Sequence, residues 1–472
     1  MKTLIALTAI VIIFYWSFQD WRRSLKAIFF VLVIEGALRK WILPQASEAI
    51  YFLKDLVLLG AYLRYFIFLG KDRFFPIQNR PINIAIFAAA GWCIFQSLNP
   101  NLGSPLVGLI GLRAYLYYIP MIWMTPSLFE SEEELYLFLR THLLLIIPVG
   151  LLGIVQFFSP SSSPINQYAP GIAVSVATFG FAGTNSVRIT GTFSYINSYQ
   201  GYLSACFALL LPLVLRKQEP LWKLLTLIEM FLVLLNSLMT GSRTPVLAAI
   251  LIAIGFWGIR ALRQPETTLL WLSRLLPFIL IAAAVAAIAF QPVLEAFWIR
   301  ATSANDLVER IQSAAIDPFS TSFATNLDGY GTGATHPGTA PMRNLLNLPP
   351  GATVPNNLEI EMPRVAIEMG PIGFGIWYGL RVSLICALGL VYLKLRKPFF
   401  RDLALSACML HIVLFTGQMV FHHIFSIYYW FTNSFIFLLP WLDYVETWRE
   451  QQQYLQFYES SAHLAESSDG QS

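Results

Sequence analysis

Charged residues are scarce in this chain, and their scarcity excludes most soluble folds. Only 12% of the 472 residues are Asp, Glu, Lys or Arg, whereas 56% are hydrophobic, and the mean hydropathy is +0.60. A soluble domain usually carries about 25% charged residues. One soluble core could not enclose so much apolar surface, because chain size limits the fraction of surface that folding buries. The composition therefore predicts an integral membrane protein.

Clustered cysteines and common cofactor motifs are also absent from the sequence. It contains no Walker A phosphate loop, dinucleotide fingerprint, nucleophile elbow or basic stripe suited to nucleic acid. The adjacent His422 and His423 have no further metal ligand at a suitable spacing. We therefore expect no cofactor, no metal and no nucleic-acid partner. Four isolated cysteines inside apolar runs are expected to be small buried side chains: Cys93, Cys206, Cys386 and Cys408.

Apolar runs of membrane-spanning length recur along the chain. A helix needs about 20 apolar residues to cross the hydrocarbon core. The sequence thus predicts an all-α polytopic membrane protein with about 12–13 transmembrane helices and one large extracytoplasmic loop. No small-x-small cleavage site follows the first run, so we expect it to be a retained helix. The apolar segments are 3–17, 27–43, 49–69, 82–98, 105–124, 137–158, 200–215, 222–239, 245–262, 270–290, 370–393, 403–421 and 425–442.

Lysines and arginines cluster in alternate loops, which sets the expected orientation. Cytoplasmic loops of membrane proteins carry an excess of these residues. The acidic loop at 125–136 falls on the same side by alternation, and so does the polar tail at 443–472, which we expect to fray. The basic loops predicted to be cytoplasmic are those around 22–26, 64–80, 216–223, 260–274 and 394–401.

The chain divides into five regions on this basis. Residues 1–158 form the N-terminal transmembrane helices, and 159–290 form the central helices with arginine-bearing outer loops. Residues 291–369 form the large extracytoplasmic loop, 370–442 the C-terminal helices, and 443–472 the tail. A long structured loop in a compact protein is usually functional, so we expect the active site beneath 291–369.

Several arginines fall on the outer side, where the charge bias makes them unexpected. Arg188 lies in NSVRITGTF and Arg243 in TGSRTPVLA; four more lie in the large loop, namely Arg300, Arg310, Arg343 and Arg364. The planar fork of a guanidinium suits a phosphate, so a converging set would suit a lipid pyrophosphate. The same side chains could instead snorkel to headgroups or pair with an acid such as Glu359 or Glu361.

The sequence around Arg243 predicts a turn followed by a helix. Gly241 permits a tight turn, and Pro245 suits a first helical turn. The first amides of such a helix favour an anion. A helix cap alone would explain the same residues. Charges inside apolar runs, Glu35 with Arg39 and Arg113, are equally consistent with a functional role or with buried ion pairs.

Four segments in order resemble the O-antigen ligase and O-antigen polymerase superfamily. TGSRTPVLAAILIAI, which contains Arg243, is similar to its signature helix, and 188–212 is similar to the segment before it. Residues 299–336 resemble the start of the family's outer loop, and 359–377 resemble its end in Glu-x-Gly-x-x-Gly. The resemblance covers roughly 180–380 and not the N-terminal third, which includes IEGALRKWILP.

This resemblance implies an inverting, metal-independent glycosyltransferase in the bacterial cytoplasmic membrane, active on its extracytoplasmic side. Such enzymes serve cell-envelope polysaccharide biosynthesis. They transfer a glycan from an undecaprenyl-pyrophosphate carrier to a hydroxyl of an acceptor glycan or lipid. Arg188 and Arg243 match the pyrophosphate-binding arginines, and Arg310 and Arg364 are further candidates. A polysaccharide or lipid-linked glycan transporter is the alternative, although no clear internal repeat favours it.

The expected general base departs from the family pattern. The ligases carry a loop His followed by Asn, whose position here falls on Glu359 and Ile360, counted back from Glu368. Glu359 is therefore the first candidate for the catalytic base and His336, in TGATHPG, the second; a third possibility is that neither serves. The departure favours a polymerase, or a ligase for another glycan, over a strict lipopolysaccharide ligase.

Overall fold

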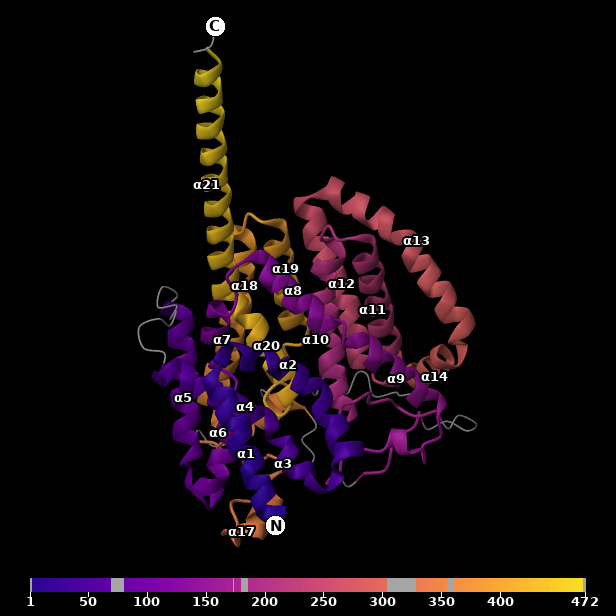
Figure 1. Cartoon of the computed structure of the whole chain (residues 1–472). Coiled ribbons are helices and arrows are strands. Elements are labelled where there is room, and N and C mark those ends of the chain that lie inside the picture. Colours follow the sequence, from indigo (N-terminus) through magenta and orange to yellow (C-terminus); the bar gives the residue numbers. More distant parts are fainter. Residues whose placement is uncertain are drawn as a thin grey trace.

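The structure is a computed structural model that describes residues 2–68, 80–172, 174–179, 186–303, 328–354 and 360–469. Figure 1 shows the arrangement of its helices. They are α1 (Lys2–Gln19), α2 (Trp21–Ala37), α3 (Ser47–Tyr51), α4 (Leu53–Tyr62), α5 (Arg80–Ser97), α6 (Pro105–Leu116), α7 (Met121–Met124), α8 (Glu132–Leu143), α9 (Ile146–Phe158), α10 (Ile196–Leu215), α11 (Pro220–Met239), α12 (Arg243–Arg263), α13 (Pro265–Ala289), α14 (Gln291–Ser303), α17 (Thr339–Leu346), α18 (Glu361–Lys394), α19 (Pro398–Val413), α20 (His423–Asn433) and α21 (Phe435–Asp469).

The expected all-helical, multi-pass class is confirmed. In the described ranges, the β structure is limited to one isolated bridge between Thr178 and Val187. Seven helices in those ranges are long and apolar enough to cross a membrane. Their bounds are Pro105–Ser127, Glu132–Phe158, Ile196–Leu215, Pro220–Met239, Arg243–Arg263, Pro265–Ala289 and Glu361–Lys394.

Seven is fewer than the 12–13 spans expected, because several apolar segments are interrupted. The segment at 49–69 is divided into α3, α4 and a π-helical stretch, Leu63–Phe68. The segment at 425–442 is divided between α20 and α21. Apolar content alone does not reveal such breaks. The tail also differs from expectation, because α21 continues through it to Asp469 and projects from the bundle as one rod (Figure 1).

Helix α10 lies at the centre of the central helices, and α13 lies at their edge. Helix α10 packs against α11, α12, α19 and α20, and most of its residues are buried. In α13, by contrast, Thr268 and Leu275 are the buried residues, and the helix arches along the outside of the bundle (Figure 1). An exposed and strongly apolar helix is suited to contact with lipid.

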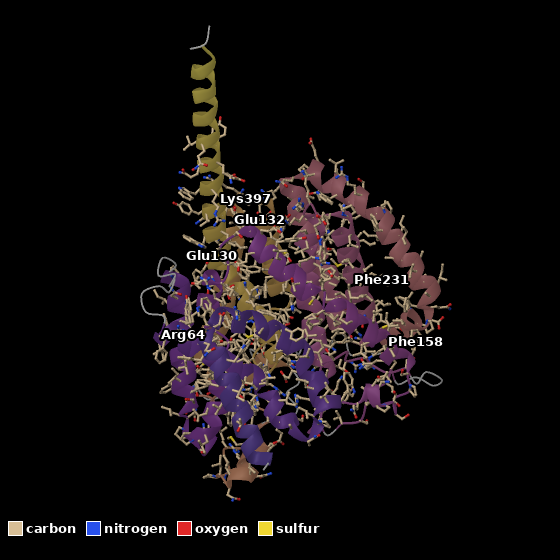
Figure 2. The ribbon with its side chains drawn as sticks, viewed as in Figure 1. Arg64, Glu130, Glu132, Phe158, Phe231 and Lys397 are labelled. Carbon is tan, nitrogen blue, oxygen red and sulfur yellow. The ribbon has the colours of Figure 1, made fainter. Side chains whose placement is uncertain are left out.

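Several of the loops expected to share the cytoplasmic side lie together at one end, while 69–79 of the loop at 64–80 lie outside the described residues. Arg22, at the start of α2, pairs with Glu130 at 3.0 Å, and Arg216, after α10, pairs with Glu133 at 2.8 Å. Figure 2 places Glu130 and Lys397 at the same end, where α21 leaves the bundle. The short helix α17 lies at the opposite end of the molecule (Figure 1).

A buried ion pair ties α18 to the connection between α19 and α20. The Glu361 carboxylate accepts a hydrogen bond from Arg381 at 3.0 Å, and its second oxygen accepts from the backbone N–H groups of Met419 and Val420 at 2.5 and 2.6 Å. Both charged side chains are almost fully buried. A buried charge is tolerated only with such partners, so this pair fixes the fold at that point.

The first prediction concerns this pair. Glu361→Ala leaves the Arg381 charge buried without its carboxylate, which should cost about 3–5 kcal/mol of folding stability. The melting temperature of detergent-purified protein measures the loss. The control is Glu450→Ala, which removes an exposed partner of Lys397 and should cost at most about 1 kcal/mol. Equal melting temperatures for the two variants would contradict the structural role of Glu361.

Candidate functional site

Three arginines gather around the turn between α11 and α12. Gly241 has φ +62°, a left-handed conformation that favours glycine. Arg188 donates from Nε to the carbonyl oxygen of Thr240 at 2.9 Å, and Arg300 donates from Nε to that of Gly241 at 2.7 Å. Arg243, the first residue of α12, donates from Nη2 to the carbonyl oxygen of Arg300 at 3.3 Å. We call these three residues the arginine turn.

The turn is built from segments far apart in the sequence. The backbone N–H of Arg188 donates to Ala177, next to the isolated bridge, and Ile189 donates to Met239 at the end of α11. The sequence predicted that Arg188 and Arg243 lie close together, and in the structure both lie at this turn. Arg300 had been noted as an outer arginine without a role. Its position just after the span of α13, at the same end as the turn, is the signal that could have assigned it.

The arginine turn concentrates positive charge. Burial, and after it the charge of Arg300, lowers the pKa of Arg188 below its usual value. Among the described residues, no carboxylate lies within ion-pair distance of Arg188. The N-terminus of α12 adds the positive end of a helix dipole. Hydrogen bonding through Nε leaves the two Nη groups of Arg188 for the paired contact that phosphate oxygens favour. The arrangement can therefore bind a phosphate group.

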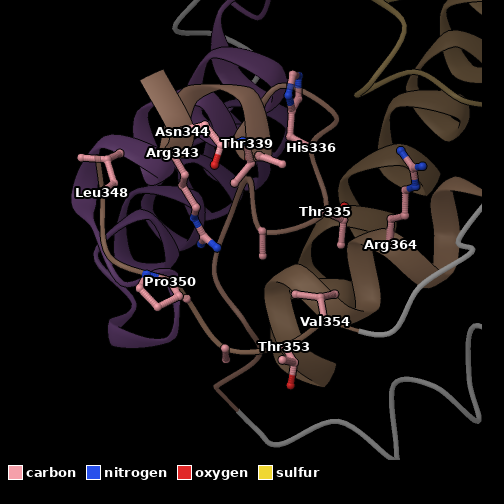
Figure 3. A pocket seen from close by; sticks show the side chains of 14 residues that line it. Thr335, His336, Thr339, Arg343, Asn344, Leu348, Pro350, Thr353, Val354 and Arg364 are labelled. Atoms are coloured by element: carbon pink, nitrogen blue, oxygen red, sulfur yellow. The ribbon is translucent and has the colours of Figure 1, made fainter. Parts of the chain in front are cut away.

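His336 and Arg364 belong to a second group of residues. They line a cavity of about 630 Å³ that also includes Arg343 and Asn344 of α17 (Figure 3). The Arg364 guanidinium lies 5.0 Å from the centre of the Phe421 ring, and the His336 ring lies 6.1 Å from it. The sequence prediction placed Arg364 with the pyrophosphate-binding arginines. The structure places it on the wall of this cavity, with the other catalytic candidate.

His336 is a neutral hydrogen-bond donor. Burial, followed by the charges of Arg113 and Arg364, lowers its pKa from 6.5 to about 4. Its Nδ1 accepts a hydrogen bond from the Gly338 N–H at 3.0 Å. The ring proton therefore resides on Nε2 at neutral pH. Such a ring orients an oxygen atom by donating to it, and is less suited to removing a proton.

A buried carboxylate holds the loop that carries His336. Glu368 accepts hydrogen bonds from the N–H and the hydroxyl of Thr335, both at 2.8 Å, and from the Tyr115 hydroxyl at 2.9 Å. The Gly331 N–H donates to the Glu368 carbonyl oxygen at 2.9 Å. Gly370 has φ +67° and interrupts α18 just after Glu368. Sequence reasoning noted both glycine motifs but assigned no role to this glutamate.

Two candidates cannot be placed. Glu359, the first candidate for the base, and Arg310 lie outside the described residues. In the described part of the chain, no group of three or more His, Cys, Asp and Glu side chains could hold a metal ion.

A network of paired charges lies between the two groups. Lys54 pairs with Glu35 at 3.0 Å, and Arg113 donates from Nε to Asp55 at 2.9 Å. Glu35 and Arg113 therefore form ion pairs, as one of the two interpretations of the sequence predicted. The Tyr51 ring lies within 4.3 to 5.1 Å of three cationic groups of this network, namely Arg39, Lys54 and Arg113.

Contacts connect this network to both sides. Lys40 donates to the carbonyl oxygen of Gly191 at 2.7 Å, and Arg39 donates to the Ser194 hydroxyl at 3.1 Å, in the segment that follows Arg188. On the other side, Arg113 lies 3.2 Å from Nε2 of His423, and the charge of Arg113 also reaches His336. These contacts link the network to the segment after Arg188 on one side and to His423 on the other.

No protein-family model matches the chain, and no curated protein is significantly similar to it. The resemblance to the O-antigen ligase and polymerase superfamily therefore remains a prediction from the quoted motifs.

The second prediction concerns the loop that carries Gly329, Gly331 and Gly333, which we call the glycine loop. Gly331 has φ +92°, and a Cβ there would meet Leu102 Cγ at 2.6 Å, so Gly331→Ala should cost about 1–3 kcal/mol of stability and displace His336. The melting temperature of the purified protein measures the loss. The matched control is Gly375→Ala, whose Cβ would meet nothing within 4 Å and which should be neutral or slightly stabilising. A neutral Gly331→Ala would contradict the packing described here.

Proposed function

We propose that this protein is an inverting, metal-independent glycosyltransferase of the bacterial cytoplasmic membrane. It polymerises or ligates a glycan carried on a lipid pyrophosphate, such as undecaprenyl pyrophosphate, and works on the extracytoplasmic side. The observation that carries the proposal is the arginine turn at the start of a membrane helix, where Arg188 and Arg300 donate to the adjacent carbonyl groups of Thr240 and Gly241, and Arg243 donates to that of Arg300. A lipid diphosphate is the anion expected at such a depth.

The path of α11 supports the assigned side. Helix α11 begins at Pro220, after the basic residues that pair with the acidic loop, and ends at Met239 beside the arginine turn. Its 20 residues span about 30 Å at 1.5 Å per residue, which is the thickness of a hydrocarbon core. The turn therefore lies one membrane thickness away from the basic loops, and the positive-inside bias assigns it to the outer surface.

The reaction follows from these positions. The oxygen of an acceptor hydroxyl attacks the anomeric carbon of the donor glycan, and the bond from that carbon to the phosphate oxygen breaks. The lipid pyrophosphate leaves with the electron pair, and the arginine turn stabilises the charge that develops on it. The hydroxyl proton passes to a base, for which Glu359 remains the first candidate from the sequence. His336 donates from Nε2 and orients a sugar oxygen.

The third prediction tests the arginine turn. Arg243→Ala and Arg188→Gln should each reduce glycan transfer by about 100-fold, because each removes charge that stabilises the leaving group. Release of undecaprenyl pyrophosphate from a lipid-linked oligosaccharide, by protein purified in nanodiscs, measures the rate. The control is Arg263→Gln, an exposed arginine at the opposite end of α12. Arg243→Ala and Arg188→Gln should both remain in the membrane. Full activity in either variant would refute the role proposed for that arginine.

A deletion strain distinguishes the forms of the activity. Accumulation of short lipid-linked glycan indicates a polymerase. Polymerised and unpolymerised glycan both left on the lipid indicates a ligase. Lipid-linked glycan retained on the cytoplasmic side would instead indicate a transporter and would contradict the proposal.

A further inference from the structure

The cavity beneath α17 has a lining that favours an anion. Two arginines, Arg343 and Arg364, line it together with His336, and none of its described lining residues is acidic. Figure 3 shows Arg343 extending from α17 toward the segment at 350–354, with Arg364 across the cavity on α18. Glu368, which holds the loop, is fully buried and already accepts three hydrogen bonds.

One side of the Arg343 guanidinium is held by the protein. Its Nη2 donates to the carbonyl oxygen of Leu102 at 2.9 Å, and its Nε is enclosed by the protein. The side chain as a whole is partly exposed and lines the cavity, so the guanidinium can meet an acceptor there. Gly351 makes room for this side chain, because a Cβ there would lie 2.3 Å from Nη2.

Other groups around the cavity suit a sugar. Asn344 and Thr353 present an amide and a hydroxyl on the lining, and His336 presents an Nε2–H donor. Neutral donors of this kind bind sugar hydroxyls, whereas the guanidinium of Arg343 binds a carboxylate with its planar fork. The volume of about 630 Å³ falls within the ordinary range for small-molecule sites and accommodates two or three sugar rings.

We propose that this cavity recognises a carboxylate-bearing sugar, such as a uronic acid, within the glycan substrate. This inference rests on the proposed glycosyltransferase function and specifies its substrate class. The carboxylate pairs with the Arg343 guanidinium, while His336 and Asn344 contact the sugar hydroxyls. Arg343 is thus a specificity-determining residue, and the enzyme selects acidic over neutral glycans.

The position of the cavity distinguishes this ligand from a second lipid phosphate. Helix α17 lies at the end of the molecule, beyond the ends of the membrane helices (Figure 1). A phosphate attached to a lipid stays at the bilayer surface, where the arginine turn already provides guanidinium groups. A sugar several units from the carrier reaches outward, to the level of α17. The outer cavity therefore fits a carboxylate of the glycan.

The test measures binding to the full-length protein in nanodiscs. The probes are trigalacturonate, an acidic trisaccharide, and maltotriose, a neutral one, and the readout is affinity by calorimetry or saturation-transfer NMR. Trigalacturonate should bind more tightly than maltotriose. Arg343→Gln should weaken trigalacturonate binding by about ten-fold, and Arg343→Lys should weaken it less because the charge remains. Arg263→Gln should have no effect.

A second variant covers the case in which Arg343→Gln unfolds the protein. Asn344 is exposed, so Asn344→Asp should fold normally and, by repulsion, weaken trigalacturonate binding more than it weakens maltotriose binding. Absence of trigalacturonate binding, equal affinity for the two trisaccharides, or unchanged binding in the folded variants would overturn the inference.

A parallel measurement separates this inference from the proposed function. Arg188→Gln should lose binding of inorganic pyrophosphate and retain binding of trigalacturonate, and Arg343→Gln should show the reverse. If Arg343→Gln binds trigalacturonate as the unmodified protein does, while Arg188→Gln loses pyrophosphate binding, the acidic-sugar site is rejected. If Arg188→Gln binds pyrophosphate normally, while Arg343→Gln loses trigalacturonate binding, the role of the arginine turn is rejected.

Discussion

The Glu368 carboxylate joins three parts of the chain that the sequence separates widely. It accepts hydrogen bonds from Tyr115 on α6 and from Thr335 in the outer loop, while lying on α18 itself. A carboxylate buried in this way is tolerated because each of its oxygens is satisfied. A Cβ at Gly329 would lie 2.6 Å from the backbone N of Gly370, so the loop approaches α18 too closely for a side chain at that position. The cavity and His336 keep their positions because this contact fixes the loop.

Charge balance divides the buried ionic groups into two kinds. Glu361 with Arg381, and Asp55 with Arg113, are acid–base pairs, and such pairing is what a low-dielectric interior demands. Arg188 is of the other kind, because its Nε donates to the carbonyl oxygen of Thr240 and the nearby charge of Arg300 lowers its pKa. Under the proposed function, an anionic substrate would offset that repulsion.

The sequence was informative where one physical rule dominates. Apolar length predicted the helices, and the loop charges predicted which loops meet at one end, as the Arg22–Glu130 contact shows. The sequence was less informative where contacts between residues far apart in the chain determine the structure. The fixing of the loop at 329–335 by Glu368 depends on residues far away in the chain. Arg300 was passed over because its helix offers no motif, and only the fold brings it to Gly241.

The N-terminal third, outside the family resemblance, contacts both sides of the site. Lys40 and Arg39 contact the segment that follows Arg188, and Arg113 lies against His423 on the side of His336. Lys40 and Lys54 are almost fully buried, and their ammonium groups are already paired within the protein, so this network has a structural role. Under the proposed function, a glycan with its pyrophosphate at the turn and an acidic sugar in the cavity has two anchors. Recognition of a distant acidic sugar would then align the glycan at the point of transfer, since the two anchors together restrict how the intervening sugars can lie.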